Sequence, residues 1–459
     1  PYTTLFRSEG IGMQLNEFID RLFERAQAAG FSDYEAYYSD GDEFEVTVFQ
    51  GEIAGYTVSS SMGLNFRGMF QGNMGYASTQ VLDEQALDML VESARQNALI
   101  IEDTDQQFIF PGSERYPDLP GANPRIAEIS EQQKIEWALE LEKAALSLDE
   151  RVKQVQSCVL ATVSGTVRIK NSKGLDVSHS SNALEAYISV VARQGDKVST
   201  GSDLLATHEV EDLNIREMAN RAVKEAVEAL SARPVASGEY KVILKNDAAA
   251  DLLGTFSGIF SAESAQKGLS LLKGREGQQI ASPNVTLMDN PHHPTALGSA
   301  PFDDEGVATT VKAVIDKGVL TTLLHNLKTA NKQGVQTTGN AAKGSYAAPV
   351  GVAPGNFYFE PSQTSLDELI AEMGNGLLIT DLQGLHAGAN GISGDFSLGA
   401  KGYLVEGGKI GRAVDQITVA GNFYQMLNVI EKVASDLKFG FGRVGSPSIR
   451  VSGLSVAGQ

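Results

Sequence analysis

The sequence predicts an α+β fold of mostly antiparallel sheets with flanking helices. Amphipathic helical segments are separated by groups of extended runs, short turn-like pairs join those runs, and strand-like runs outnumber helices in the second half. Extended runs that follow one another across tight turns are typical of antiparallel meanders. A chain of 459 residues suggests two or three domains.

The first half shows the order helix, sheet, helix twice. Helices are predicted over 15–29, 83–97, 130–148 and 212–232, where apolar residues recur at helical spacing. The extended runs form two groups, which are 44–49, 53–60, 64–69 and 74–79, and then 152–163, 166–171, 175–180 and 183–193. Prolines at four positions in 106–130 indicate a long surface loop between the two units.

The second half is richer in strands. Its clearest hairpin joins Tyr403–Glu406 to Lys409–Val414 through Gly407-Gly408, because such a turn needs the positive φ that glycine tolerates. A second hairpin is predicted around Asp316-Lys317-Gly318, between 311–315 and 319–324. The other predicted elements are strands over 240–244, 377–382, 448–451 and 454–456, and helices over 247–264, 365–373 and 422–435.

These patterns divide the chain into an N-terminal α+β domain over 13–235 and a β-rich C-terminal domain over 236–459. Pro234 and Gly238 interrupt regular structure at the connection. Residues 1–12 precede Met13 and lack the apolar core of a signal peptide. We expect these twelve residues to be an extraneous or disordered leader.

Composition excludes several classes of function. The net charge of −20 repels phosphate backbones and anionic lipid, so no nucleic-acid or membrane partner is expected. No apolar stretch reaches the 18 or so residues needed to span a bilayer. The single cysteine, Cys158, rules out an internal disulfide and fits a reducing compartment. We therefore expect a cytoplasmic protein.

Histidines offer no recognisable zinc motif. In the segment that begins His208-Glu209, Asp212 stands where a helical His-Glu-x-x-His would need its second histidine. His292-His293 lies in a proline-bounded loop, and His325 alternates with apolar residues as in a strand. His386 is a better candidate, because the glycines around it let a ligand approach the backbone closely.

Nucleophile and phosphate motifs are weak as well. Ser61 and Ser397 have nearby glycines but no histidine paired with them in sequence, and neither lies in a G-x-S-x-G elbow. Gly339–Ser345 lacks the spacing of a phosphate-binding loop, so nucleotide binding is not expected. An independent hydrolase that uses Asp395 or a serine remains the weakest of the alternatives.

A glycine-dense stretch with polar residues is the remaining candidate site. An exposed edge strand here could pair with an extended peptide, whereas the alternative is that the glycines serve only turns and bulges. Asp395 could equally accept local backbone N–H groups. The substrate-groove candidates are His386, Asn390, Gly391, Gly394, Asp395 and Ser397.

Several long blocks, in order, resemble the TldD/PmbA family, and in particular its PmbA (TldE) branch. The blocks are GLNFRGMFQGNMGYAST, FDDEGVATTVKAVIDKGVLTTLLHNLKTANKQG, TTGNAAKGS, GDFSLGAKGYLVEGGKI and SPSIRVSGLSVAG. The resemblance runs from about Met13 to the end of the chain. It implies a subunit of a metallopeptidase with an N-terminal α+β domain and a β-rich C-terminal domain.

In the TldD branch, a His-Glu-x-x-x-His stretch on a helix and a late cysteine supply the metal ligands and the general base. Aligned on Leu252-Leu253, these helix positions fall on Gly254, Thr255 and Ile259 here. The loop DLKFGFGRVGSP has no cysteine. The resemblance thus implies that this chain binds no cofactor, and that zinc belongs to a TldD-type partner.

The expected function is that of the TldE/PmbA-like subunit of a cytoplasmic heterodimeric peptidase that cleaves unfolded or small peptides. The chain would shape the substrate channel and would not itself hydrolyse peptide bonds. The alternative is a non-enzymatic peptide-binding or regulatory protein, for instance a homodimer. Chelator-sensitive cleavage by the isolated chain would contradict both.

Overall fold

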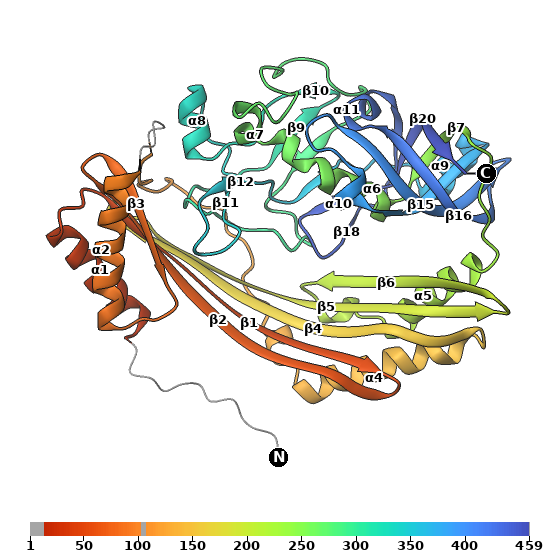
Figure 1. Ribbon diagram of the computed structural model, residues 1–459, viewed down its shortest axis with the longest axis horizontal. Helices are drawn as coiled ribbons and strands as arrows, with labels where there is room; N and C mark the ends of the chain where they lie inside the picture. Colours follow the sequence, from red (N-terminus) through yellow and green to blue (C-terminus); the bar gives the residue numbers. More distant parts are fainter. Residues whose placement is uncertain (1–12, 102–106, 459) are drawn as a thin grey trace.

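A long six-stranded antiparallel sheet forms the base of the molecule, and the C-terminal domain lies over one of its faces (Figure 1). The computed structural model describes residues 13–101 and 107–458, so the predicted leader 1–12 lies outside the described residues. The sheet has the order β3-β2-β1-β4-β5-β6. Its strands are β1 (Tyr34–Phe49), β2 (Glu52–Phe70), β3 (Asn73–Thr79), β4 (Val152–Asn171), β5 (Asp176–Gln194) and β6 (Lys197–Thr207).

The two predicted meanders are halves of this one sheet, because β1 pairs with β4. The pairing begins where Glu35 lies opposite Asn171 and ends where Thr47 lies opposite Val159. The predicted runs 53–60 and 64–69 are a single strand, β2, and four later runs are only β4 and β5. Each boundary that we predicted inside these strands was wrong. Small polar residues there suggested turns, but pairing with a long neighbour keeps the backbone extended.

Helices cover the opposite face of the sheet. Alternate strand residues such as Ala36 and Phe66 pack against the first helices, while Val46 and Leu160 pack against the later ones. Asp83 and Ser130 cap two of them by accepting the N–H groups three residues on, as the sequence predicts. These helices are α1 (Leu15–Ala28), α2 (Glu84–Ile100), α4 (Glu131–Leu148) and α5 (Ile215–Ala229).

Two short helical turns complete the N-terminal half. The predicted loop over 106–130 contains α3 (Pro124–Ala127), which Asn123 caps. The predicted start of the later helix at Asp212 is instead a separate 3-10 turn, Val210–Asp212, ahead of α5. Both differences concern short elements whose apolar periodicity is too brief to detect.

A closed β-barrel forms the core of the C-terminal domain. The strands run in the order β16-β15-β14-β7-β20, and β20 also pairs with β16, so the ring has no open edge between these strands. The predicted Gly407-Gly408 hairpin joins β15 to β16, with φ of 57° and 74°. The strands are β7 (Gly238–Leu244), β14 (Gly376–Gln383), β15 (Asp395–Glu406), β16 (Lys409–Asn422) and β20 (Ile449–Ala457).

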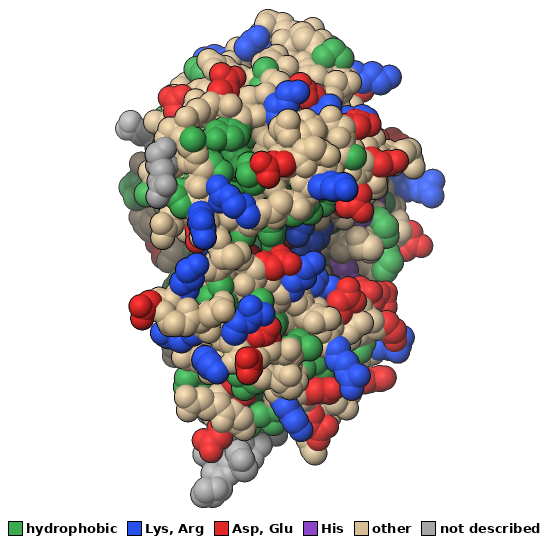
Figure 2. Space-filling view, turned by 90° about the vertical axis from the view of Figure 1, so that its right-hand side faces the viewer, with side chains coloured by type: hydrophobic (Ala, Val, Ile, Leu, Met, Phe, Trp, Pro, Cys, Tyr) green, Lys and Arg blue, Asp and Glu red, His purple; other side chains and the backbone are tan. Residues whose placement is uncertain are grey.

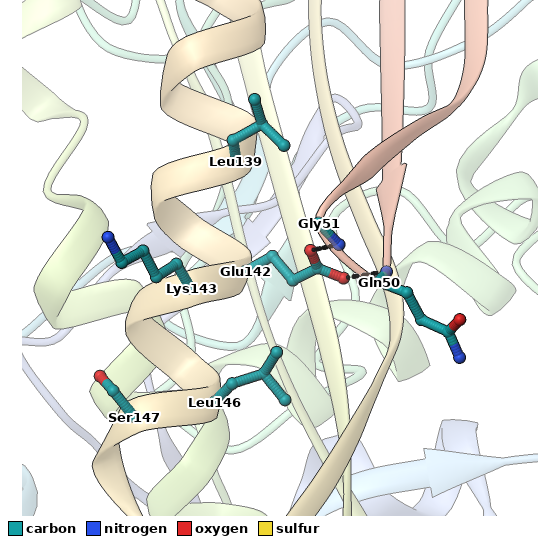
Figure 3. Close-up of a pocket in the computed structure, with 7 residues that line it drawn as sticks. All are labelled: Gln50, Gly51, Leu139, Glu142, Lys143, Leu146 and Ser147. Atoms are coloured by element: carbon teal, nitrogen blue, oxygen red, sulfur yellow. Dashed lines mark hydrogen bonds between the residues drawn. The ribbon is translucent and has the colours of Figure 1, made fainter.

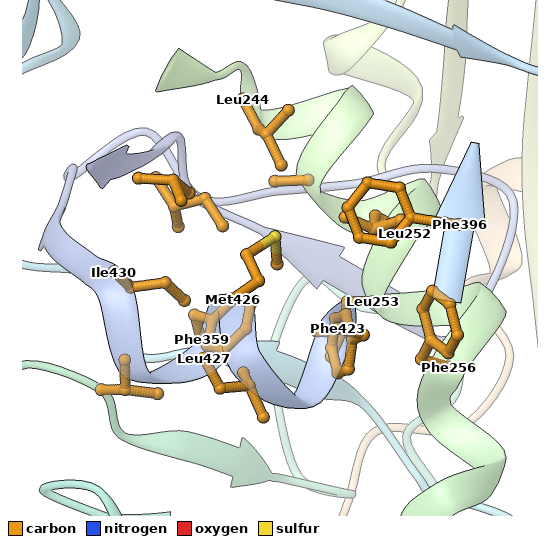
Figure 4. Packing of buried hydrophobic residues seen from close by; sticks show 14 of the residues in the cluster. Leu244, Leu252, Leu253, Phe256, Phe359, Phe396, Phe423, Met426, Leu427 and Ile430 are labelled. Atoms are coloured by element: carbon orange, nitrogen blue, oxygen red, sulfur yellow. The ribbon is translucent and has the colours of Figure 1, made fainter. Parts of the chain in front are cut away.

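Helix α6 (Asn246–Phe256) packs into this core (Figure 4). The ring of Phe256 stacks on Phe423 at 4.7 Å between centroids and lies 6.3 Å from Phe396. The predicted helix 247–264 was wrong in its length, because α6 ends at Phe256 and a 3-10 turn separates it from α7 (Ala262–Gln266). Gly258 stands in that turn and disfavours a continuous helix.

The predicted helix 422–435 is also mostly wrong. Only α11 (Phe423–Met426) and a 3-10 turn form, and β17 (Ile430–Val433) then pairs with β20. The β-branched residues Val429, Ile430 and Val433 suit a strand. The helix predicted from the Ser365 cap is confirmed as α9 (Leu366–Met373), with a reciprocal capping box to Glu368.

The C-terminal domain contains a further sheet, in the order β10-β9-β8-β13-β19-β18. The predicted hairpin around Lys317-Gly318 is confirmed as β9–β10. Its strands are β8 (Leu287–Asp289), β9 (Lys312–Asp316), β10 (Val319–Leu320), β13 (Phe357–Phe359), β18 (Lys438–Phe439) and β19 (Val444–Ser446). The remaining elements are α8 (Leu327–Gln333), α10 (Leu385–Gly388), β11 (Ala341–Ala342) and β12 (Gly351–Val352). Over the described residues, no helix is both long and apolar enough to cross a bilayer.

Candidate functional site

Helix α6 and the loop before β19 are the two segments in which the family resemblance places metal ligands. The fold brings them together. A Cβ atom added to Gly254 would lie 3.8 Å from the Cβ atom of Val444. Segments almost 200 residues apart in sequence therefore meet at the position to which the resemblance assigns metal ligands.

The side chains at this position do not suit zinc. Gly254 has none, Thr255 donates its hydroxyl to the carbonyl of Asp251 at 2.8 Å, and Ile259 is a core residue that is 1% exposed. Zinc sites use imidazole, thiolate or carboxylate ligands, and these residues provide none of them. Within 13–101 and 107–458, no three His, Cys, Asp or Glu side chains lie close enough to share a metal. The expectation that this chain binds no zinc stays a prediction.

Carboxylates do line the neighbouring face of α6. Burial and the nearby carboxylates Asp247 and Asp381 raise the pKa of Asp251 to about 6. Lys438 of β18 pairs with Asp247 at 3.0 Å, and Lys401 lies 3.7 Å from Asp381. The sequence analysis missed this group. Two aspartates four residues apart on an otherwise apolar helix were the available signal.

The glycine-dense stretch forms a closed turn at one end of the barrel. Asn390 accepts the backbone N–H groups of Ile392 and Ser393 and donates its own N–H to the carbonyl of Asp395. Asp395 in turn accepts hydrogen bonds from Ser393 and Asn422, and these bonds lower its pKa. The local role of Asp395 that we weighed as an alternative is therefore present.

Both sides of strand β15 are occupied at this point. Asp395 and Ser397 pair with β16 on one side, while Ala389 bridges to Phe396 on the other. Gly394 is buried with φ of 83°, and a Cβ there would lie 2.5 Å from the ring of Tyr424. His386 on α10, Gly391, Asp395 and Ser397 remain exposed. A peptide contact at this surface stays a prediction, and it would involve exposed side chains.

Four other histidines, His208, His292, His293 and His325, have structural surroundings. His208 lies 2.6 Å from the carbonyl of Asn182, and His292 lies 3.0 Å from the hydroxyl of Thr309. His293 packs against two aromatic rings, those of Tyr358 and Phe439. The prediction that His325 lies in a strand was wrong. This histidine is buried and directly precedes Asn326, the cap of α8. Asp212 accepts the hydroxyl of Thr207 at 2.6 Å.

A polar cavity of about 210 Å³ lies between the base sheet and the C-terminal domain. The sheet contributes Asp40, Thr166 and His179, and the C-terminal domain contributes Arg443 and backbone around Gly298. Figure 2 shows the end of the molecule on which these two parts meet around a hollow, with acidic and basic side chains interspersed. The sequence analysis missed His179 and Arg443, which lie more than 260 residues apart.

A larger, open depression of about 620 Å³ lies beside the β1–β2 turn (Figure 3). The buried carboxylate of Glu142 on α4 accepts the N–H groups of Gln50 and Gly51 there, both at 2.7 Å. Leu139, Lys143, Leu146 and Ser147 of the same helix also line the depression. Because both oxygens of this carboxylate bind the backbone of the turn, we assign Glu142 a structural role and do not propose a catalytic site in the depression.

Comparison with known proteins agrees with this architecture. Three family models match in order, namely PmbA/TldA metallopeptidase domain 1 over 34–98, the central domain over 124–230 and the C-terminal domain over 237–458. The chain belongs to the PmbA/TldD family. A metalloprotease PmbA homolog from Haemophilus influenzae is 28% identical, with 97% of this chain and 96% of that protein covered.

Two solved structures resemble this PmbA/TldD protein over nearly its whole length. A putative modulator of DNA gyrase from Thermotoga maritima has a TM-score of 0.90 and 36% identity, covering 97% of this chain and all of that one. TldE from Thermococcus kodakarensis has a TM-score of 0.88 and 25% identity, covering 96% of this chain and all of the other. The α+β fold and the family resemblance are thus confirmed.

Proposed function

We propose that this chain is the TldE/PmbA-type subunit of a cytoplasmic heterodimeric metallopeptidase that acts on unfolded or small peptides. A TldD-type partner supplies the zinc and the general base. The present chain shapes the channel through which the peptide reaches them. Membership of the PmbA/TldD family supports the peptidase context.

One observation supports assigning the zinc and the general base to the partner and not to this chain. Helix α6 and the start of β19 are in contact, yet Gly254, Thr255 and Ile259 stand where the resemblance places ligands and base. Hydrolysis of a peptide bond by zinc needs a bound water and a nearby proton acceptor. A glycine, a threonine and an isoleucine offer neither a ligand set nor such an acceptor.

The test is reconstitution. This chain and a TldD-type chain are purified separately, and cleavage of an unfolded peptide is followed for each alone and for the mixture. We expect cleavage only when the TldD-type chain is present, and loss of cleavage on adding a chelator. Chelator-sensitive cleavage by this chain alone would overturn the proposal.

The alternative function is a non-enzymatic peptide-binding or regulatory homodimer. The Thermotoga maritima relative is described as a putative modulator of DNA gyrase, which is a regulatory description. Sedimentation of the lone chain and of its mixture with the partner distinguishes the two. A stable homodimer that takes up no TldD-type chain would favour the alternative.

A further inference from the structure

We propose that the cavity between the base sheet and the C-terminal domain binds the C-terminal carboxylate of a peptide through Arg443, with His179 on the opposite wall. This inference rests on the proposed function in that it takes the ligand to be a peptide. It adds a specific binding site whose residues lie outside the glycine-dense stretch.

Arg443 is exposed, and its aliphatic stem packs against Gly298. A Cβ on Gly298 would lie 2.6 Å from Cγ of Arg443. The arginine side chain therefore passes the backbone at a position where only glycine leaves room for it. Its backbone carbonyl accepts the N–H of Phe357 at 2.8 Å. The guanidinium is close enough to Tyr37 to lower the pKa of that phenol against the dominant effect of burial. Arg443 therefore projects from the C-terminal domain toward the sheet.

The guanidinium makes no hydrogen bond or ion pair with any residue of the described chain. The carboxyl groups that line the cavity are already engaged, and Asp303 among them accepts three backbone N–H groups. Asp40 accepts the N–H of Thr166 at 3.0 Å and the hydroxyl of Tyr38 at 3.1 Å. Asp304 accepts the hydroxyl of Tyr37 at 2.8 Å. An arginine is always charged, and a planar carboxylate is its best-matched partner.

His179 on β5 is the second polar group in this cavity that makes no hydrogen bond within the described residues. It is half-buried, and burial together with nearby His208 lowers its pKa. The neutral ring carries one N–H donor and one acceptor. It can therefore bind an amide group or the second carboxylate oxygen of a ligand that Arg443 holds.

The cavity volume limits the ligand. A space of about 210 Å³ equals that of about seven water molecules at about 30 Å³ each. This is smaller than a typical pocket for a drug-sized molecule, which is about 300 Å³ or more. The end of a peptide chain fits such a space. The nearby carboxyls of Asp40 and Asp304 disfavour a doubly charged anion such as phosphate.

The experiment compares acetyl-Ala-Ala-Ala carrying a free carboxylate with the same peptide as its carboxamide, by calorimetric titration of the full chain at low salt. We expect the amide to bind about tenfold to a hundredfold more weakly, which is the usual effect of losing a charge-assisted hydrogen bond. Arg443→Gln should abolish the difference. Arg443→Lys should restore only part of it, because lysine cannot bind bidentately.

Arg216→Gln is the matched control, since it removes an exposed arginine on α5 outside the cavity. Equal binding of acid and amide, no effect of Arg443→Gln, or no binding of either peptide would overturn the inference. Inorganic phosphate that binds more tightly than the peptide acid would also overturn it, by revealing a general anion site. The proposed function is judged separately by the reconstituted cleavage assay, so each can fail while the other stands.

Discussion

Asp303 is a buried carboxyl group in a loop of the C-terminal domain that faces the base sheet. It is 6% exposed and accepts backbone N–H groups from Glu305, Val307 and Ala341 at 2.9–3.0 Å. Burial is the largest effect on its pKa, and the neighbouring carboxyl of Glu305 acts in the same direction. Together they raise the pKa of Asp303 to about 8 despite the three hydrogen bonds.

This raised pKa predicts a pH-dependent stability. Between the ordinary value of 3.8 and about 8, the folded chain binds more protons at Asp303 than the unfolded chain does. The contribution of this group is therefore full below pH 3.8 and is lost as the pH rises through 8. Asp303→Asn should flatten the slope of unfolding free energy against pH over this window, as measured by urea unfolding.

The slope is the informative quantity, because the asparagine also loses one acceptor for a backbone N–H and lowers stability at every pH. Asp316→Asn, at an exposed position in the β9–β10 hairpin, is the control and should leave the slope unchanged. A variant at Asp303 with the wild-type slope would show that this carboxyl is ionised in the folded protein.

At the scale of elements, the β15–β16 hairpin provides a matched pair of glycines. Both have positive φ, but only a Cβ on Gly408 would meet the backbone, at 2.8 Å from the carbonyl oxygen of Ala371. Gly407→Ala should cost about 1–2 kcal/mol of unfolding free energy, the usual penalty for left-handed backbone. Gly408→Ala should cost more than Gly407→Ala, since the clash adds to the strain. Equal losses in urea unfolding would contradict the packing described for this turn.

Elements that depend on local signals were predictable from the sequence. Helix caps at Asp83 and Ser365 and the glycine turn at Gly407 are determined within a few residues. Elements that depend on distant partners were not. The sequence of β17 predicts the continuation of a helix, but its pairing with β20 makes it a strand. Strand β2 continues through Gly63 because β1 pairs with it there.

The candidate site divides in the same way. The identities of Gly254, Thr255 and Ile259 could be read from the sequence, because the family pattern fixes their spacing. The grouping of Arg443 with His179 could not, since the two lie in different domains and neither belongs to a local motif. No periodicity in the sequence identifies the residues that face a cavity between the base sheet and loops of the C-terminal domain.

For the whole molecule, a buried ion network ties the base sheet to the C-terminal domain. Arg67 of β2 is 5% exposed and binds Glu35 of β1 at 2.7 Å, with Glu305 of the C-terminal domain 3.8 Å away. Glu305 also accepts the N–H of Leu327 at the start of α8. Close by, the ring of Tyr346 lies against the backbone of Gly63, where a Cβ would overlap it.

Removing the cation from this network should separate the two parts. Arg67→Met leaves two buried carboxylates without their partner, and breaking a buried pair in this way costs about 3–5 kcal/mol. We expect that loss in urea unfolding, together with faster proteolysis at the connection around residues 232–238. Arg95→Met is the control, because its pair with Glu92 is exposed to solvent and should contribute little to stability. A loss for Arg67→Met no larger than that of the control would show that the network does not hold the domains together.

The metal content of the isolated chain tests the central claim most directly. The protein is purified without chelator, dialysed against zinc-containing and then metal-free buffer, and its zinc is measured by plasma mass spectrometry. A polypeptide with Gly254, Thr255 and Ile259 at the ligand and base positions should retain far less than stoichiometric zinc. Stoichiometric zinc that survives dialysis, bound by atoms of this chain, would contradict the account.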